Sequence, residues 1–219
     1  MKDRNTRPLE WVLFDWNGTL LDDAEYGIAI VNELCVEFNV PAISKERYLK
    51  HFGFPLIEFY EKMGFDFSKY SFDHLSQVFM QKYHENLATI TLHDEVIEVL
   101  TELSHSYRLG IISAYKQSRL IEAVSNYGVA HFFECVYGIA DDRADSKSHS
   151  LKQMLTTHAI NPAEAILVGD TLHDYEVAEE NGMPALLIEE GHQSREQWVP
   201  FNVTSIDSLK DLPRFLEQW

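Results

Sequence analysis

The sequence predicts an α/β protein: a doubly wound, Rossmann-like parallel sheet core with a small all-helical cap domain inserted after the first strand. Three observations predict this fold. Short apolar runs without polar alternation recur along the chain, as in strands covered on both faces. Amphipathic helical segments separate most of these runs, which is the alternation of strand and helix typical of parallel α/β sheets. One long stretch near the N-terminus has helical periodicity only.

Apolar runs bounded by turn residues are the predicted strands, and they cover residues 11–14, 109–112, 135–137, 165–168 and 185–188. Between the later runs, apolar residues recur at helical spacing around 96–103, 120–127 and 151–158. Gly128 follows the second of these segments, in the position after a helix end where glycine is common. Strand and helix therefore alternate over the second half of the chain.

Residues 22–92 contain no strand-like run. Apolar side chains there recur at steps of three and four, first as Ala24, Ile28, Val31, Leu34, Cys35 and Phe38, then as Phe72, Leu75, Phe79, Tyr83 and Leu87. A stretch of about seventy residues is far longer than a normal crossover between strands. We therefore predict a core of residues 1–21 and 93–219, with a helical cap formed by 22–92.

The composition limits the class of partner. The 219 residues include 18 Lys and Arg against 35 Asp and Glu, a net charge of −17, and 45% are hydrophobic. A chain this apolar is no disordered acidic tail, and its length suits one domain with an insertion. The negative charge argues against binding nucleic acid or an anionic membrane, which both require a positive field. We expect a small-molecule partner instead.

The sequence also predicts a cytoplasmic protein. The first ten residues are polar, with no apolar segment of a signal peptide, and no apolar run approaches the length of a membrane span. Cys35 and Cys135 lie a hundred residues apart among apolar neighbours, which favours reduced cysteines in the core over a disulfide.

Polar residues follow several of the predicted strands. The first strand is followed by Asp15-Trp16-Asn17-Gly18-Thr19 and the second by Ser113; the third is followed by Asp141, Asp142, Asp145 and Lys147, and the fourth by Gly169 and then Asp170-Thr171-Leu172-His173-Asp174. In an open α/β sheet, ligands bind at the carboxyl ends of the strands. We therefore expect a single crevice lined by Asp15, Ser113, Lys147, Asp170 and Asp174.

These side chains are of the types that bind a metal ion and a phosphate group. Carboxylates without a Cys or His cluster suit a hard cation such as Mg²⁺. A lysine, a serine hydroxyl and the N–H groups of the Gly18 turn would bind phosphate oxygens, and an aspartate at a strand end can attack phosphorus. Each part alone also fits a structural role, because Asn17-Gly18 suits an ordinary turn and Asp170 and Asp174 suit helix capping.

Two longer segments resemble motifs of the haloacid dehalogenase superfamily. VLFDWNGTLLD is similar to its first motif and AILVGDTLHDYEVAEENGMPALLI to its fourth, while GIISA with Ser113 resembles the second and Lys147 stands where the third-motif lysine is expected. The resemblance runs from Trp11 to Ile188, includes a C1-type helical cap and points to phosphoglycolate-phosphatase-like members. It implies a hydrolase that uses Mg²⁺ and acts on a small phosphorylated metabolite.

The resemblance also implies roles for single residues. Asp15 would be the nucleophile, and Mg²⁺ would be bound by its carboxylate, the Asn17 backbone carbonyl and Asp170. Asp174 would hold a metal-bound water or Lys147. The phosphoryl oxygens would be bound by Gly18, Thr19, Ser113, Ala114 and Lys147. Lys152 competes with Lys147 for the lysine role, but we expect Lys152 to lie within the helix.

Asn17 departs from the family pattern, because phosphatases of this superfamily usually carry an acid–base aspartate there. An amide cannot shuttle a proton, and a positioned acid–base group contributes roughly 10²–10⁴ in rate. Three hypotheses follow: a phosphatase for leaving groups that need no proton, such as acyl phosphates; a phosphonoacetaldehyde-hydrolase-like enzyme with a cap lysine, Lys50 or Lys62; and a weakly active phospho-ligand-binding or regulatory module. A dehalogenase would not need the full Mg²⁺ set.

Overall fold

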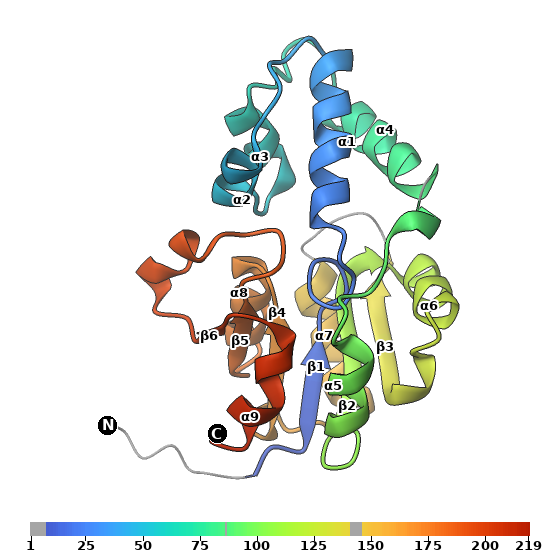
Figure 1. The fold of residues 1–219 in the computed structure, drawn as a ribbon, viewed down its shortest axis with the longest axis vertical. Helices are drawn as coiled ribbons and strands as arrows, with labels where there is room; N and C mark the ends of the chain where they lie inside the picture. Colours follow the sequence, from blue (N-terminus) through green and yellow to red (C-terminus); the bar gives the residue numbers. More distant parts are fainter. Residues whose placement is uncertain (1–7, 86, 141–145) are drawn as a thin grey trace.

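The computed structural model of the chain describes residues 8–85, 87–140 and 146–219. A six-stranded, fully parallel sheet in the order β3-β2-β1-β4-β5-β6 forms its centre (Figure 1). The strands are β1 (Trp11–Phe14), β2 (Arg108–Lys116), β3 (Phe133–Ile139), β4 (Ala165–Gly169), β5 (Ala185–Ile188) and β6 (Ser205–Ile206). The predicted α/β class is therefore confirmed. Each of the five predicted strands exists, and β6 is an additional short edge strand.

Helices cover both faces of this sheet. They are α5 (Val96–Leu103), α6 (Gln117–Asn126), α7 (Ser146–Thr157), α8 (Leu172–Glu180) and α9 (Leu212–Leu216). Along β1, Val12 and Phe14 pack in the cluster that includes α5, α6 and α9, whereas Trp11 and Leu13 pack in the cluster that includes α7 and α8. Because both faces are buried, the strand reads as a continuous apolar run.

Gly128 has a positive φ of 74°, as expected of a residue just after a helix. Several connecting segments contain short 3₁₀ helices. The 3₁₀ helices are η1 (Leu87–Thr89), η2 (Ala130–Phe132), η3 (Pro162–Glu164), η4 (Arg195–Gln197), η5 (Val199–Phe201) and η6 (Leu209–Asp211). Among the described residues, no helix has the length and apolar character needed to cross a membrane.

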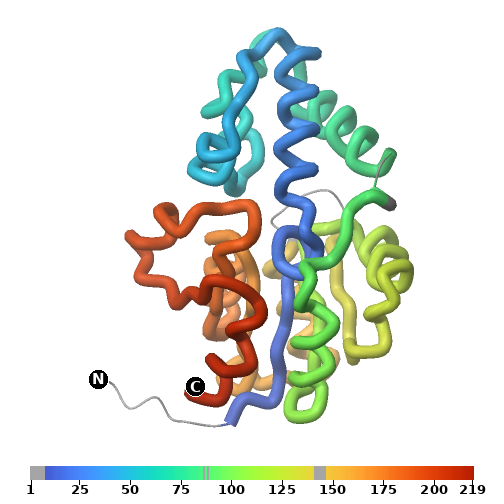
Figure 2. The backbone as a smooth tube through the Cα atoms, in the orientation of Figure 1, coloured from blue at the N-terminus to red at the C-terminus, as the bar shows by residue number. Residues whose placement is uncertain are grey.

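The insertion between β1 and α5 is helical, and it lies beyond the carboxyl ends of the strands (Figures 1 and 2). It contains α1 (Ala24–Glu37), α2 (Lys45–His51), α3 (Leu56–Met63) and α4 (Phe72–Glu85). The two chain segments that connect it to the core run side by side: the Asp22 N–H donates to Thr91 O at 2.9 Å, and the His93 N–H donates to Leu20 O at 3.1 Å. We propose the domain boundaries, 21/22 and 92/93, at this crossing.

The cap also contacts the core away from the connecting segments. Gln193 Nε2 donates to Phe52 O at 2.7 Å, and the Ser194 N–H donates to Leu49 O at 2.9 Å. These bonds attach the end of α2 to the loop after β5. Cys35, in the cap, and Cys135, in β3, are both buried and free, as the sequence predicts.

Candidate active site

The strand register brings the predicted residues to one edge of the sheet. Phe14, the last residue of β1, is level with Ile111 on β2 and with Val168 on β4. The residues that follow these positions, Asp15, Ser113 and Asp170, therefore come from neighbouring strands at the same end. Ser113 lies within β2 rather than after it, because this strand continues with irregular register to Lys116.

Three carboxylates meet at this edge. Asp15, Asp170 and Asp174 each present an oxygen within 4.8 Å of the others, and all three side chains are buried, with Asp15 the most exposed at 8%. Asp15 follows β1, Asp170 follows β4, and Asp174 lies in the first turn of α8. Asp141, Asp142 and Asp145, which also follow a predicted strand, lie outside the described residues.

Lys147 lies between two of these carboxylates. It is 1% exposed, and its Nζ is 2.8 Å from Asp15 Oδ1 and also donates to Asp174 Oδ1. Burial alone would lower the pKa of Lys147, but the two negative charges outweigh burial and raise it. The ammonium group is therefore charged. Lys152, the competing lysine, is exposed on the outer part of α7, so the structure brings Lys147 and not Lys152 to the site.

Asp174 is held from both sides. Its Oδ1 accepts from Lys147, while its Oδ2 accepts from the Thr171 N–H at 3.0 Å and the Thr171 hydroxyl at 2.7 Å, which closes the first turn of α8. Burial raises the pKa of this carboxyl, but Lys147 overcomes that effect, and the pKa is lowered. Asp174 is thus an ionised group that orients Lys147.

The pKa values of Asp15 and Asp170 are raised, in contrast to that of Asp174. Burial, only partly offset by Lys147, raises the pKa of Asp15 to about 6. Burial raises the pKa of Asp170 to about 7, against the opposing charge of His192. Two buried carboxylates that resist ionisation are a suitable binding site for a hard divalent cation, whose charge would stabilise them. Asp15 and Asp170 therefore fit a Mg²⁺ site, and the Asn17 backbone carbonyl as a further ligand stays a prediction.

Gly18 is required by the close packing at this turn. Its φ is +73°, and a Cβ there would lie 2.4 Å from Asp170 Oδ2 and 2.5 Å from His192 Cδ2. The Gly18 N–H donates to Asp23 Oδ1 at 2.7 Å, and the Thr19 hydroxyl donates to Asp170 Oδ1 at 3.0 Å. These two groups are therefore engaged within the protein. Gly18 has no second donor, so these bonds give no support to its predicted role in phosphate binding, while the prediction for Thr19 depends on its backbone N–H.

On β2, Ser113 is 2% exposed, and its Oγ accepts from the Tyr115 N–H at 3.2 Å. The hydroxyl proton of Ser113 is not used in that bond. Ala114 follows at the same edge and is partly buried. Their assignment to phosphate binding remains a prediction.

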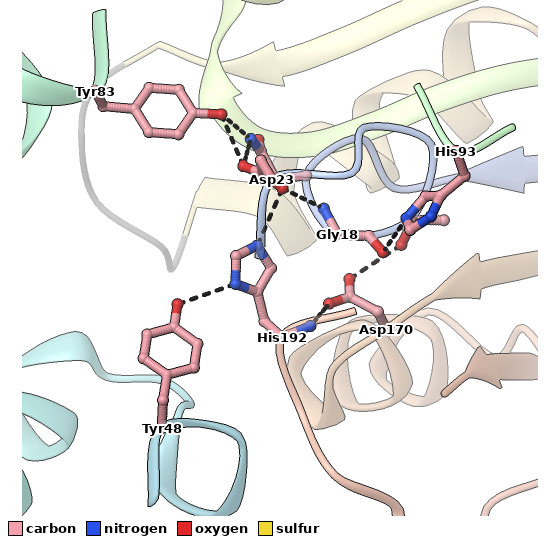
Figure 3. Close-up of polar contacts among 9 residues, drawn as sticks. Gly18, Asp23, Tyr48, Tyr83, His93, Asp170 and His192 are labelled. Atoms are coloured by element: carbon pink, nitrogen blue, oxygen red, sulfur yellow. Dashed lines mark hydrogen bonds and ion pairs between the residues drawn. The ribbon is translucent and has the colours of Figure 1, made fainter. Parts of the chain in front are cut away.

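Figure 3 shows four buried residues next to this site that the sequence does not single out: Asp23, Tyr48, Tyr83 and His192. Together with Asn17, which donates to Asp23 and Tyr83, they form what we call the Asp23 cluster. Asp23 faces His192, with Oδ1 3.1 Å from Nε2. Burial alone would raise the pKa of Asp23 and lower that of His192, but their mutual attraction reverses both effects. The pKa of His192 rises to about 9.

One signal in the sequence could have identified His192. Ligands bind beyond the carboxyl ends of the strands in such a sheet, and His192 follows the end of the fifth predicted strand. The His192 N–H in fact donates to Asp170 Oδ2 at 2.7 Å. Asp23 offers no such signal, because next to the exposed Asp22 it looks like an ordinary residue at the start of a helix.

Known proteins share this fold and sequence pattern. The family model described as haloacid dehalogenase-like hydrolase matches residues 12–188. A phosphoglycolate phosphatase of Synechococcus elongatus is 25% identical over 192 residues, which cover 87% of this chain and 89% of that protein. A pyrophosphatase PpaX of Bacillus velezensis is 28% identical over 170 residues, covering 74% of this chain and 75% of its own.

Solved structures agree with this assignment. A haloacid dehalogenase-like family hydrolase of Streptococcus pneumoniae superposes with a TM-score of 0.74 and 26% identity, over 94% of this chain and 98% of that one. The family model covers both the segment around Asp15 and the segment around Asp170, together with the helical insertion between β1 and β2. The chain therefore belongs to the haloacid dehalogenase-like hydrolase family.

Proposed function

We propose that the protein is a Mg²⁺-dependent phosphatase that hydrolyses a small phosphorylated metabolite, a phosphate ester or an acyl phosphate, through an aspartyl-phosphate on Asp15. The observation that carries this proposal is the buried arrangement of Asp15, Lys147, Asp170 and Asp174 at the carboxyl edge of the sheet. The names of the relatives, a phosphoglycolate phosphatase and a pyrophosphatase, point to phosphate hydrolysis as well.

In this mechanism an Asp15 carboxylate oxygen attacks phosphorus. The new bond joins phosphorus to Asp15, and the bond from phosphorus to the leaving oxygen breaks, with its electron pair departing on that oxygen. Lys147 neutralises negative charge next to Asp15, and Asp174 keeps the ammonium group in place. Water then attacks the phosphorus of the aspartyl-phosphate, and the bond from phosphorus to Asp15 breaks with its electron pair returning to the carboxylate. Both protons of the water leave with the inorganic phosphate, and Asp15 is restored.

Asp15, Asp170 and the Asn17 backbone carbonyl would bind Mg²⁺ in this proposal. The cation would shield the attacking carboxylate from the negative charge of the phosphoryl group. Asp170 already accepts hydrogen bonds from Thr19 and His192, which fix the orientation of its carboxylate. A carboxylate oxygen has more than one acceptor site, so these bonds are compatible with a metal ligand role.

The phosphonoacetaldehyde-hydrolase-like alternative has less support. A lysine that forms a Schiff base needs a lowered pKa, which proteins achieve by burial or by neighbouring cations. The Lys50 side chain is 62% exposed and lies 3.7 Å from Glu196, and Lys62 is exposed as well. Neither cap lysine is buried.

The test is a screen of phosphate esters, acyl phosphates and phosphonates with Mg²⁺, on the wild-type protein and on Asp15→Asn. We expect turnover of phosphate compounds by the wild type and a loss of at least about 10³-fold in Asp15→Asn, because the nucleophile is removed. Asp73→Asn, an exposed change of the same chemistry on α4, is the matched control. Full activity in Asp15→Asn would exclude the proposed nucleophile.

The screen also distinguishes a phosphatase from the remaining alternative, a protein that binds phosphate compounds without hydrolysing them. A phospho-ligand-binding or regulatory module would show a raised melting temperature with phosphate compounds and Mg²⁺, but no release of inorganic phosphate from any of them. That result would replace the phosphatase with a binding protein that uses the same residues.

A further inference from the structure

Segment 191–193 of the loop after β5 lies directly against Asp170. The His192 N–H donates to Asp170 Oδ2 at 2.7 Å, and the Thr19 hydroxyl donates to Oδ1 at 3.0 Å. A Cβ on Gly191 would lie 2.2 Å from the same Oδ2, so only glycine lets the backbone come this close. Asp170 is 0% exposed, and water cannot readily replace these contacts. The orientation of the Asp170 carboxylate therefore depends on where this segment lies.

The His192 ring attaches this segment to the cap. Its Nδ1 is 2.9 Å from the Tyr48 hydroxyl of α2, and the ring stacks on Phe52 with the ring centroids 4.9 Å apart. Its Nε2 is 3.1 Å from Asp23 Oδ1, next to the start of α1. Figure 3 shows that the backbone of His192 contacts Asp170, while the ring contacts Tyr48 and Asp23. One residue thus joins the cap to the carboxylate.

Gln193 attaches the same segment at two further points. Its Oε1 accepts from the Leu172 N–H at 2.7 Å, at the start of α8, and its Nε2 donates to Phe52 O at 2.7 Å, at the end of α2. The segment is therefore bonded on one side to Asp170 and the start of α8, and on the other side to the cap. A movement of the cap away from the core would break bonds on one of these two sides.

The orientation of Asp170 matters because of the cation that it would bind. Asp15 and Asp170 present oxygens within 4.8 Å of each other. Mg²⁺ requires nearly ideal octahedral geometry, with ligand oxygens at about 2.0–2.1 Å, so it tolerates little rotation of a ligand carboxylate. Groups that orient a metal ligand typically change metal affinity by roughly 10–100-fold.

We propose that His192 is a positioning residue: its ring, held by Asp23 and by Tyr48 of the cap, keeps its backbone N–H on Asp170, so that the docked cap and the Mg²⁺ site stabilise each other. This inference rests on the Mg²⁺ site of the proposed function and goes beyond it, because it couples metal binding to cap docking. Such coupling is reciprocal. The docked cap raises the affinity for Mg²⁺, and Mg²⁺ favours the docked cap by the same factor.

The first test is titration with MgCl₂ alone, followed by isothermal titration calorimetry. Tyr48→Phe removes only a hydroxyl of the cap and should raise the Kd for Mg²⁺ by about 2–10-fold. His192→Ala removes the whole ring and should raise it by about 10–100-fold. His192→Gln, whose amide N–H can again donate to Asp23, should recover part of the affinity. The matched control is Tyr70→Phe, since the Tyr70 hydroxyl bonds only the Asp66 N–H within the cap, and its Kd should equal that of the wild type.

The sign of the change separates positioning from electrostatics. Loss of the positive charge on the His192 ring would by itself strengthen Mg²⁺ binding, whereas loss of positioning weakens it. Tyr48→Phe changes no charge and keeps the ring of Tyr48, so the test does not depend on the folding of His192→Ala.

Hydrogen exchange tests the reciprocal effect without any measurement of activity. In the wild type, Mg²⁺ should slow exchange at residues 49–53, where α2 is bonded to the loop after β5, more than at residues 31–36, in the end of α1 that points away from the sheet (Figure 1). Tyr70→Phe should retain this difference, and Asp170→Asn should abolish it.

Two kinds of failure can be told apart. An equal Kd in the wild type, Tyr48→Phe and His192→Ala, or a lower Kd in His192→Ala, would overturn the positioning role while leaving the Mg²⁺ site in place. Absence of Mg²⁺ binding by the wild type, or binding that Asp170→Asn leaves unchanged, would refute the metal site of the proposed function and this inference with it.

Discussion

At the scale of single residues, Lys147 is the side chain on which the site's electrostatics depend. It is buried between Asp15 and Asp174. Lys147→Met keeps most of the apolar volume but leaves two carboxylates facing each other without a cation. We expect kcat to fall by about 10²–10³ and the free energy of unfolding at pH 8 to fall by about 3–5 kcal/mol.

Steady-state kinetics and urea denaturation measure these two effects. Lys152→Met is the matched control, because Lys152 is exposed on the same helix. It should change the free energy of unfolding by less than about 0.5 kcal/mol. Comparable losses in both variants would contradict the assignment of Lys147.

The position of Lys147 can be predicted from the sequence, whereas the partners of Gly18 and Thr19 cannot. Lys147 and Lys152 are five positions apart, and the sequence favours Lys147 because Lys152 is expected within the helix. In the structure both lysines lie in α7, and they differ in burial, because Lys147 is 1% exposed and Lys152 is exposed. The polar roles of Gly18 and Thr19 were harder to predict. Their hydrogen bonds go to Asp23 and Asp170, and such choices depend on distances of a few tenths of an ångström that a residue pattern does not contain.

At the scale of elements, α2 of the cap is joined to the core by Tyr48. Its hydroxyl lies 2.9 Å from His192 Nδ1, and its ring stacks on Phe52. Tyr48→Phe removes only the hydroxyl, and we expect the free energy of unfolding to fall by about 0.5–1.5 kcal/mol. Hydrogen exchange should become faster at residues 49–53 and 192–194, where cap and core are bonded to each other.

Tyr26→Phe is the control for this prediction. The Tyr26 hydroxyl donates to the backbone oxygens of Lys82 and Tyr83 within the cap. Its removal should weaken the contact between α1 and α4 without faster exchange at 49–53. If Tyr26→Phe and Tyr48→Phe gave the same exchange pattern, Tyr48 would have no specific role in docking the cap.

The elements themselves were predicted to different extents. The long strands were found because burial on both faces makes each of them a continuous apolar run. Strand β6 was missed, because its two residues are only half-buried and carry no such pattern. The helical insertion was predicted from spacing alone, but the attachment of α2 to the loop after β5 is a contact between segments far apart in the chain.

At the scale of the whole molecule, stability without metal should depend on pH through the buried site. The native pKa values of Asp15, about 6, and Asp170, about 7, lie above their ordinary value of 3.8. Between pH 4 and 7 the native state therefore binds more protons than the unfolded state, and the free energy of unfolding falls as pH rises. His192, with its pKa raised from 6.5 to about 9, adds stability below pH 6.5 that is lost through pH 9.

Binding of Mg²⁺ to Asp15 and Asp170 should restore the stability that is lost when these carboxyl groups ionise. Protons on Asp15 and Asp170 compete with the cation at pH 5 and are absent at pH 8. We expect the apparent Mg²⁺ affinity, measured from the shift in melting temperature, to be at least about tenfold lower at pH 5 than at pH 8, because each pH unit below a ligand's pKa costs a factor of about ten. Asp170→Asn should remove most of the shift at both pH values. A Mg²⁺ affinity that does not change with pH would argue against these ligands.

The sequence by itself determined five of the strands and the helical insertion, and it predicted that Asp15, Lys147, Asp170 and Asp174 lie at one edge of the sheet. It could do so because strand burial imposes an apolar run and parallel strands end at a common edge. Only the tertiary structure decided the partners of Asn17. Asp23 and His192 are 169 positions apart and meet because the cap and the loop after β5 close on the same turn. Hydrogen-bond partners within a buried cluster are set by that packing, which leaves no periodic trace in the sequence.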